Sequence, residues 1–511
     1  MTDNVKYRLI LNPIHPLHLG NLSIIYQAYN KLTKLPDAKL LIIINDLSNI
    51  YLEDDIEKFV KDILWLNLKK IKIVRISKYY TNIIGCVIQL LWNNMAYIHN
   101  NNIYLKNNIN YNAPFTYYTG WLTNHTNLLH PNDPIILYNF NNFGVIMAKP
   151  IIDPTFAIAI IDFNEQVNCL INTNYPETNK LLNEIVFSYL NPHIYNLALQ
   201  HYRIPPIKTC SIDDYRIINL NYTHNGLLKL ITNNNIPSYN EVNLLTIAGI
   251  RKKGYPPKIL KKFAEYGNKL TDVDIRELDT ITINSLISDS KKYNIRKGSC
   301  IIDPIKVIIN NWDQNTTEFI VRNKFRNFIP ICKIIYLERT DCTNLKAGTI
   351  IKLKFSYFLK IINIQPDYIT VNVLNTYYKH TIPKYEFLNW VSSEKYDMLP
   401  KQCTINISKN FYLGSSAIPP INKQQAYILS YDLDNFLATL KNTTNDDSQQ
   451  KIYKNSRYIA YQSNPIFNFD KLGFFTLELD TFYKDGSIIF NMLIGLKKLN
   501  SIVKTKTFLH E

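Results

Sequence analysis

The chain has 511 residues, of which 46% are hydrophobic and 13% are aromatic. This length allows about two to four domains with sizeable cores, and this composition excludes general disorder. The net charge of +16 suits a polyanionic partner such as nucleic acid, although codon bias towards lysine and asparagine would also raise it.

The sequence contains no signal pattern and no apolar run near the roughly 18 residues that a membrane helix needs. We therefore expect a soluble cytoplasmic protein that has no membrane partner. The seven cysteines are scattered singly along the chain. Their spacing predicts neither a disulfide framework nor a metal site built by protein residues.

The first predicted elements are a strand, a tight turn and a helix. Residues 7–11 form a short apolar run, Pro13 cannot continue a strand ladder, and residues 22–32 have helical apolar spacing. Between them, Gly20 would allow close approach to the backbone, and a helix N-terminus would direct N–H groups at an anion such as a nucleotide phosphate. His18 would lie beside that anion, although a histidine next to a glycine is more often structural.

The next predicted strand ends in polar residues. Residues 38–46 form a continuous apolar run that finishes with Asn45 and Asp46. Such a run is typical of a buried parallel strand, and ligands of open α/β sheets lie at the carboxyl ends of their strands. Asp46 could therefore contact a ligand, or it could cap the following turn.

Later segments continue the alternation of helix and strand. Residues 54–68 and 80–98 have the spacing of helices, and a short strand is expected at 71–76 between them. This order predicts a doubly wound parallel sheet. Residues 135–162 are expected to return to strands.

The second half of the chain changes character. Arg251, Lys252 and Lys253 followed by Gly254 predict the C-terminal end of a helix. These cations could contact a phosphate backbone, or they could simply be solvated. From about residue 315 the hydrophobic period falls from about 3.6 residues to about 2, which predicts β-structure.

Several of these segments resemble one family. His18-Leu19-Gly20-Asn21 resembles the His-Ile-Gly-His motif of class I aminoacyl-tRNA synthetases, in the form found in the glutamyl and glutaminyl enzymes. Residues 245–255 resemble that family's Pro-Thr-Ile-Ser-Gly-Leu-Arg-Arg-Arg-Gly-Tyr, residues 302–307 its Ile-Asp-Pro-Val-Lys, and residues 389–392 its His-Trp-Val-Ser. The β-rich C-terminal half favours the glutaminyl type, because bacterial glutamyl enzymes carry an α-helical domain there.

The resemblance implies a multidomain α/β and all-β architecture. A doubly wound, Rossmann-like catalytic domain would comprise residues 1–102 and 140–225, interrupted by a shortened acceptor-stem insertion at 103–139. A helical connecting domain would follow at 226–314. Two β-barrels that bind the anticodon would occupy residues 315–511.

The resemblance also implies an activity, its cofactors and its site residues. A monomeric ligase would use ATP and Mg²⁺ to activate glutamine and attach it to tRNA(Gln). The residues that would bind ATP are Asn12, Pro13, His18, Gly20, Asn21, Ile217, Ile218, Asn225, Gly226 and Leu227. Those that would bind glutamine are Arg8, Asn45, Asp46 and Ile161, and those that would bind tRNA are Arg251, Lys252, Lys253, Arg339 and Lys471. The candidate catalytic residues are His18, Asn21 and Lys229.

Departures from the family pattern leave alternatives open. Asn21 replaces the second histidine of the first motif, Ile161 stands where the family has a pocket tyrosine, and Leu227 stands where it has a catalytic loop lysine. Lys229 could supply the missing cation only if the loop were rearranged. The chain could therefore be a synthetase-like tRNA-binding protein without catalysis, or a glutamyl or nondiscriminating ligase. Arg339 and Lys471 could also be ordinary surface cations.

Overall fold

The computed structural model describes residues in two compact units. One unit comprises residues 1–216 and 264–271, and the other comprises 217–263 and 272–511. The residues outside the description are 1–4, 14–15, 36, 48–51, 93, 100–101, 106–115, 118–150, 173–207, 212–215, 218–229, 231–236, 268–269, 271, 292, 322–327, 375–386, 394–397, 409, 414–417, 430–432, 434–436, 438–463 and 496–511.

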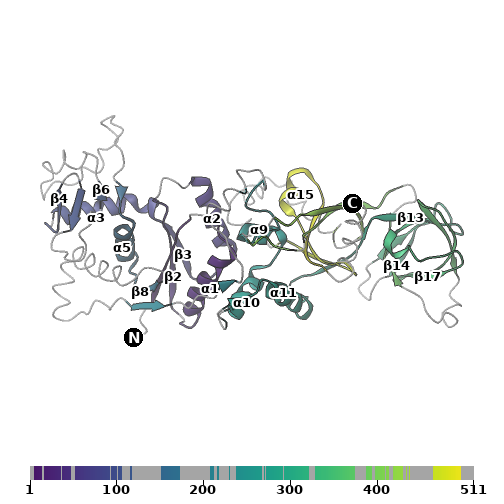
Figure 1. Ribbon diagram of the computed structural model, residues 1–511, viewed down its shortest axis with the longest axis horizontal. Coiled ribbons are helices and arrows are strands. Elements are labelled where there is room, and N and C mark those ends of the chain that lie inside the picture. The colour runs from purple at the N-terminus through teal and green to yellow at the C-terminus, as the bar shows by residue number, and fades with distance from the viewer. Residues whose placement is uncertain are drawn as a thin grey trace, which may run out of the picture. The chain divides into compact units, whose positions relative to one another are not determined.

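The first unit is built on a parallel sheet of five strands. Its strand order is β3-β2-β1-β8-β9, and every neighbouring pair is parallel (Figure 1). The chain adds β2 and β3 on one side of β1 and then β8 and β9 on its other side, which is the order of a doubly wound sheet. The strands are β1 (Lys6–Leu11), β2 (Lys39–Ile44), β3 (Ile71–Arg75), β8 (Cys169–Asn172) and β9 (Lys208–Ser211).

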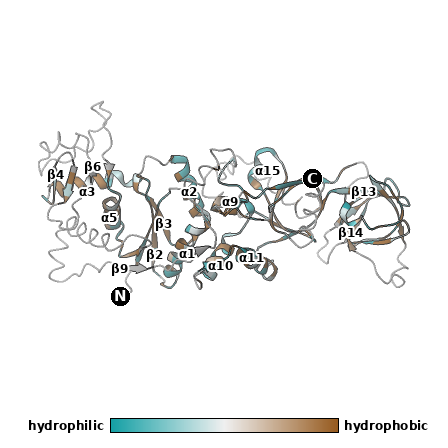
Figure 2. Cartoon of the chain, in the orientation of Figure 1, coloured by the Kyte–Doolittle hydropathy of each residue, from teal (hydrophilic) through white to brown (hydrophobic). Residues whose placement is uncertain are grey.

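Helices cover both faces of this sheet. In Figure 1, α1 and α2 lie on one face, and α3 and α5 lie on the other. Leu41 and Ile43 of β2 pack in one core cluster with residues of α3 and α5, because alternate side chains of a strand point to opposite faces. In Figure 2, the brown colour of hydrophobic residues appears along β3 and α1. The helices are α1 (Leu19–Thr33), α2 (Glu53–Trp65), the 3₁₀ turn η1 (Ile76–Tyr79), α3 (Tyr80–Trp92) and α5 (Pro154–Glu165).

Two of the predicted elements were wrong in this unit. The helix expected at 80–98 ends at Trp92, and Ala96–His99 forms strand β4, because Asn94 adopts a left-handed φ of 58° that stops the helix. The strands expected up to residue 162 give way to helix α5. The Asp153 side chain caps that helix by accepting a hydrogen bond from the Phe156 amide (3.0 Å), and Pro154 occupies its first turn.

A small antiparallel sheet adjoins the α3 region. Its order is β4-β5-β6-β7, and Ala96, Ile103 and Leu105 contribute to the same core as α3 and α5. Most of the expected insertion at 103–139 lies outside the described residues. The strands are β4 (Ala96–His99), β5 (Asn102–Leu105), β6 (Thr116–Tyr117) and β7 (Ile151–Ile152).

The second unit contains a closed barrel of six strands. Its order is β12-β23-β22-β26-β25-β24. Phenylalanines fill its interior, and the ring centroids of Phe469 and Phe490 lie 5.1 Å apart. The strands are β12 (Arg296–Ile302), β22 (Lys401–Ile407), β23 (Asn422–Leu429), β24 (Ile466–Phe469), β25 (Gly473–Leu477) and β26 (Ile489–Gly495).

A second sheet of seven strands has the order β20-β17-β18-β19-β13-β16-β21. β12 of the closed barrel and β13 of this sheet begin before the expected boundary at 315, so the helical range expected at 226–314 also contains β-strands. The alternation of buried and exposed residues already starts in β13. The strands are β13 (Pro304–Ile309), β16 (Ile334–Glu338), β17 (Ile350–Leu353), β18 (Phe358–Ile364), β19 (Tyr368–Leu374), β20 (Phe387–Leu388) and β21 (Trp390–Ser392).

Short elements complete the description. Among the described residues, no helix is both long and apolar enough to span a membrane. The remaining elements are β10 (Arg216–Ile217), α9 (Ile247–Lys253), α10 (Pro257–Gly267), β11 (Asp272–Val273), α11 (Arg276–Ser288), the hairpin β14 (Glu318–Val321) and β15 (Phe328–Ile331), η3 (Arg339–Asp341) and α15 (Leu479–Asp485).

Candidate functional site

The N-terminus of α1 is closed by a reciprocal cap. His18 Nδ1 accepts a hydrogen bond from the Gly20 amide (3.0 Å), and Asn21 Oδ1 accepts one from the His18 amide (3.2 Å). Asn21, which departs from the family motif, therefore satisfies a backbone donor that would otherwise lack a helical partner. Because Nδ1 of His18 acts as acceptor, the ring proton of neutral His18 is placed on Nε2.

The carboxyl ends of β1 and β2 lie side by side next to this cap. The two strands pair up to Leu11 and Ile44, and Asn45 Nδ2 donates a hydrogen bond to Asn12 Oδ1 (3.1 Å). The structure thus brings the predicted ATP and glutamine residues Asn12 and Asn45 together. This edge is where open α/β sheets bind ligands.

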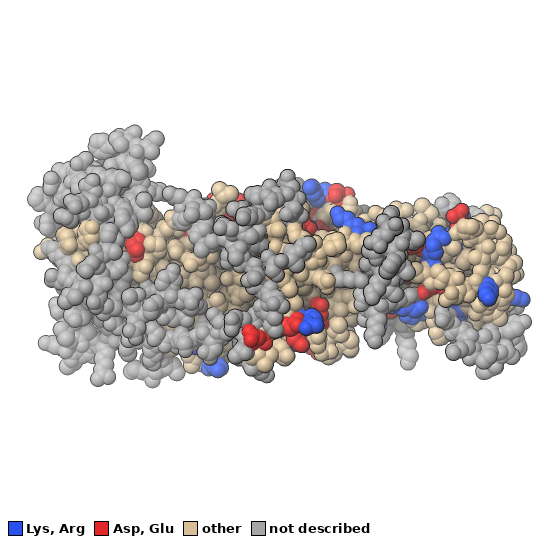
Figure 3. Space-filling model, in the orientation of Figure 1, with Lys and Arg blue, Asp and Glu red and all other residues tan. Residues whose placement is uncertain are grey.

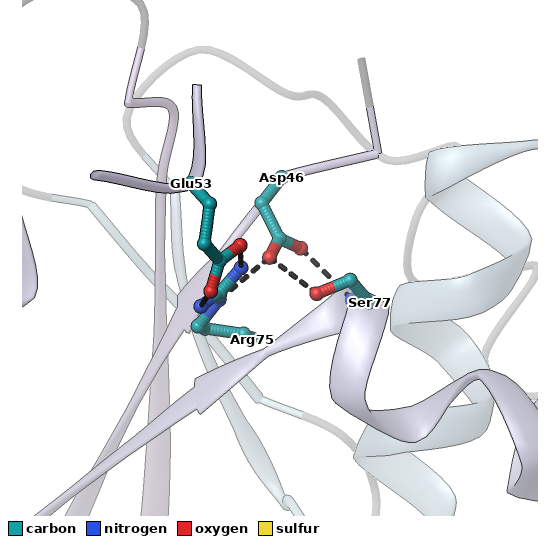
Figure 4. Close-up of polar contacts among 4 residues, drawn as sticks. All are labelled: Asp46, Glu53, Arg75 and Ser77. Atoms are coloured by element: carbon teal, nitrogen blue, oxygen red, sulfur yellow. Dashed lines mark hydrogen bonds and ion pairs between the residues drawn. The ribbon is translucent and has the colours of Figure 1, made fainter. Parts of the chain in front are cut away.

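Asp46 is fully engaged with neighbouring side chains. Its Oδ2 accepts hydrogen bonds from Arg75 Nε (2.7 Å) and Ser77 Oγ (2.6 Å), and its Oδ1 accepts one from the Ser77 amide (2.8 Å) (Figure 4). Arg75 also forms a bidentate pair with Glu53, with both distances 2.6 Å. These hydrogen bonds from the Arg75 guanidinium lower the pKa of Glu53. The carboxylate of Asp46 therefore ties the end of β2 to the end of β3.

The site residues predicted from the sequence do not include Arg75, Ser77 or Glu53. Arg75 ends β3 just as Asp46 follows β2, so the rule that drew attention to polar residues at strand ends would also have indicated Arg75. The bidentate geometry between Arg75 and Glu53 depends on the start of α2 and has no signal in the sequence.

Arg8 and Ile161 are both buried. Arg8 is 2% exposed, and its Nη1 lies 3.3 Å from Asp162 Oδ2, itself in a fully buried side chain. Within the part of the chain that the structure describes, Arg8 Nε and Nη1 make no hydrogen bond. Ile161, on α5, is fully buried in the hydrophobic cluster. The prediction that it lines a polar glutamine pocket is therefore corrected, because its side chain packs in the core.

Lys253 is also buried, which corrects its expected role in tRNA binding. It is 2% exposed, its Nζ donates to the Ser408 carbonyl (3.2 Å), and the same atom lies 4.1 Å from the centroid of the Phe411 ring. A phosphate could not reach it without unfolding this contact. These contacts with Ser408 and Phe411 join α9 to the segment that follows β22.

Arg251 and Lys252 remain at the surface of α9 and stay candidates for tRNA contact. Lys252 Nζ lies 3.4 Å from Glu478 Oε1, and its carbonyl accepts a hydrogen bond from Asn491 Nδ2 (3.0 Å). The helix ends at Gly254, whose φ of 103° gives the glycine stop that the sequence predicted.

The burial of Lys253 makes the stability of the protein depend on pH. Burial lowers the pKa of this ammonium from 10.5 to about 8, and the Asp279 carboxylate opposes the shift. Between these values the unfolded chain holds a proton that the folded chain lacks, so the free energy of unfolding should rise with pH by roughly 1–3 kcal/mol. Urea unfolding at pH 7 to pH 10 measures this rise.

Lys253→Met should abolish that rise, because the titrating group is removed. Lys360→Met, on the exposed face of β18, is the matched control and should keep it. A stability that stays flat across this range in the wild-type protein would contradict the prediction.

Arg339 lies in η3, and Lys471 lies in the turn between β24 and β25. Lys471 Nζ lies 3.8 Å from Asp341 Oδ2, two residues after Arg339. Arg339 Nη1 donates to the Pro366 carbonyl (2.7 Å), and Lys471 Nζ donates to the Phe387 carbonyl (3.0 Å). Both side chains are partly exposed, so their expected role in tRNA binding stays a prediction with a suitable placement.

The remaining predicted site residues lie largely outside the description. Ile217 ends β10, but its side chain is not described, and Pro13 is buried after β1. The predicted residues Ile218, Asn225, Gly226, Leu227 and Lys229 are outside the described residues. Across the described residues, no group of three or more His, Cys, Asp and Glu side chains could hold a metal ion.

Comparison with known proteins identifies one region of the second unit. Residues 298–379 match the family described as tRNA synthetases class I (E and Q), anti-codon binding domain. This range runs from β12 to just beyond β19. The chain is thus similar to class I tRNA synthetases of the glutamyl and glutaminyl type, which confirms the resemblance inferred from its motifs.

Two of the curated relatives that the chain matches are glutamine-tRNA ligases. The chain is 24% identical over 309 residues to that of Buchnera aphidicola (subsp. Acyrthosiphon pisum, strain Tuc7), covering 54% of this chain and 50% of the relative. It is 23% identical over 350 residues to that of Vibrio cholerae (strain O395), covering 61% and 57%. The chain therefore matches about half the length of these relatives.

Among solved structures, a glutamate tRNA ligase from Elizabethkingia meningosepticum matches 51% of this chain and 60% of its own, at 13% identity and a TM-score of 0.28.

Proposed function

We propose that the protein is an aminoacyl-tRNA ligase that activates glutamine with ATP and attaches it to tRNA(Gln). The observation that carries this proposal is the match of residues 298–379 to an anticodon-binding domain of class I synthetases. The parallel sheet with a capped helix at its carboxyl edge supports it, because such an edge suits a nucleotide.

In this reaction a carboxylate oxygen of glutamine attacks the α-phosphorus of ATP, and pyrophosphate leaves. A hydroxyl at the 3′ end of tRNA then attacks the activated carbonyl, and AMP leaves. At the start of α1, His18 Nε2 and Asn21 Nδ2 would hold the phosphates, because the Gly20 amide already donates to His18 Nδ1. Mg²⁺ would be bound through the phosphates, where it neutralises their charge.

Arg8 supports the binding of an amino acid at this edge. Its Nη1 is paired with Asp162, whereas its Nε makes no hydrogen bond in the described part of the chain and could donate to an oxygen of the substrate, either amide or carboxylate. Asn12 and Asn45 would add polar contacts beside it.

A second candidate function is tRNA binding without aminoacylation. One observation favours it: of the residues expected at the glutamine site, Asp46 is engaged in an ion pair with Arg75 and Ile161 is buried in a hydrophobic core. A glutamine pocket would then lack two of its expected contacts, and discrimination by hydrogen bonding would fall steeply.

Aminoacylation of tRNA(Gln) with glutamine and, separately, with glutamate tests the proposal. We expect transfer of glutamine in the presence of ATP and Mg²⁺. A titration of tRNA binding at several salt concentrations serves as the control for folding, because phosphate contacts make affinity fall with salt. Salt-sensitive binding with no charging of either amino acid would overturn the ligase and leave the second function. Transfer of glutamate alone would assign a glutamyl ligase.

A further inference from the structure

The amino edge of the parallel sheet, where its strands begin, carries a row of lysines. Lys6 is the first residue of β1 and Lys39 is the first residue of β2, and the two are partners in the strand register. Lys70 immediately precedes β3, and its carbonyl accepts a hydrogen bond from the Leu40 amide (3.0 Å). Because neighbouring strands lie about 4.8 Å apart, these lysines follow one another along the edge.

The turns that enter the sheet from two helices add further lysines. Lys34 is the C-cap residue of α1, and Lys69 precedes Lys70 in the turn between α2 and β3. The Lys69 amide donates to the hydroxyl of Tyr29 on α1 (3.4 Å), which joins the two turns. We call the exposed residues Lys34, Lys39, Lys69 and Lys70 the lysine edge. Figure 3 shows basic atoms at the border of the first unit below α1, as α1 is labelled in Figure 1.

Little acidic charge balances the lysine edge. Asp37 is the acidic residue in the segments 31–41 and 67–72, which carry all four lysines. Elsewhere in this unit exposed cations lie beside carboxylates, as Lys72 Nζ does at 2.6 Å from Glu165 Oε1. The lysine edge therefore keeps a positive potential that attracts an anionic partner.

The needs of the fold do not account for these lysines. A cation at the end of a helix is favoured by the helix dipole, which explains Lys34 on α1, but the other three lysines lie outside helices. Lys70 has a φ of 59°, which glycine or asparagine would adopt at lower cost. Codon bias raises the lysine content of a whole chain, but it does not favour one edge of a sheet.

We propose that the lysine edge binds the phosphate backbone of an RNA strand without reading its sequence. Lysine ammonium groups contact phosphates as point charges, and such contacts carry no sequence information. The inference goes beyond the proposed function, because it needs neither glutamine nor ATP. It also concerns the opposite edge of the sheet from the α1 cap: β1 has six residues, so the two edges lie roughly 17 Å apart.

The chemistry of the lysine edge favours RNA over a protein or a membrane. Protein interfaces are depleted in lysine and enriched in arginine and aromatic residues, whereas all four cations here are lysines. Anionic lipids also attract lysines, but stable attachment to a membrane needs a second contribution, such as inserted apolar side chains. Leu35, which is 39% exposed, is a single apolar side chain in this turn.

Binding of a short, fluorescently labelled poly(U) RNA to the full chain at several salt concentrations tests the proposal. We expect wild-type binding whose affinity falls as salt rises, because phosphate contacts release counterions. Lys39→Gln/Lys69→Gln should reduce the slope of log affinity against log salt by about 0.7 for each lysine, which lowers affinity roughly 25-fold near 0.1 M salt. Its thermal midpoint should equal that of the wild type, because both side chains are exposed.

The matched control is Lys58→Gln/Lys484→Gln, which removes the same charge from exposed positions on α2 and α15. It should bind poly(U) as the wild type does. Equal affinities of the two double variants would overturn the proposal, and so would wild-type binding to anionic phospholipid vesicles but not to poly(U). Aminoacylation is a separate readout: Lys39→Gln/Lys69→Gln should charge tRNA(Gln) at the wild-type rate. A wild type that binds poly(U) but charges no tRNA would refute the proposed function alone.

Discussion

Arg8→Met should lower the free energy of unfolding by about 3–5 kcal/mol, because it leaves a buried carboxylate without its cation. Arg8 is 2% exposed and Asp162 is fully buried, with 3.3 Å between Nη1 and Oδ2. An uncompensated charge in this core would cost far more than the lost contact of the arginine stem. Urea unfolding at pH 7 measures the difference.

The double variant Arg8→Met/Asp162→Leu is the informative partner. Replacing both charges by apolar groups of similar size is often neutral, so most of the lost stability should return. If the single variant is as stable as the wild type, the pair is not what holds β1 to α5. A stable Arg8→Met that has lost activation of glutamine would instead make Arg8 a substrate-binding residue.

Elements with strong local signals could be predicted from the sequence. The apolar runs gave β1, β2 and β3, because a buried parallel strand needs no partner information to be recognised. The glycine stop after α9 was equally local. Helix α5 was missed although Asp153 and Pro154 are a local start signal, because its apolar run of Ala157 to Ile161 is also compatible with a strand.

Side-chain roles that depend on long-range contacts could not be predicted. Lys253 looks like one more cation at a helix end, and only its contacts with Ser408 and Phe411 bury it. Asp46 follows a strand as a ligand residue would, but Arg75 and Ser77 satisfy it. In both cases the pattern identified a polar residue correctly placed on its element, while the partner came from another element.

Gly254→Ala should be the more disruptive of two comparable glycine substitutions. Gly254 has a φ of 103°, and an added Cβ would lie 2.1 Å from Thr476 Cγ2 and 2.3 Å from Thr476 Oγ1. Thr476 is fully buried, and its hydroxyl donates to the Lys253 carbonyl (2.8 Å), so it cannot rotate away without losing that bond. Strain and overpacking together should lower the free energy of unfolding by about 2–5 kcal/mol.

Gly486→Ala separates the two causes. Gly486 also has a left-handed φ, 77°, at the end of α15, but an added Cβ would meet nothing within 4 Å. It should therefore show only the backbone strain, about 1–2 kcal/mol. If urea unfolding shows the same loss of unfolding free energy for both variants, Thr476 moves aside to accommodate the added Cβ at Gly254. A larger loss at Gly254, accompanied by weaker tRNA binding, would show that close packing of α9 on β25 also positions Arg251 and Lys252 for the RNA.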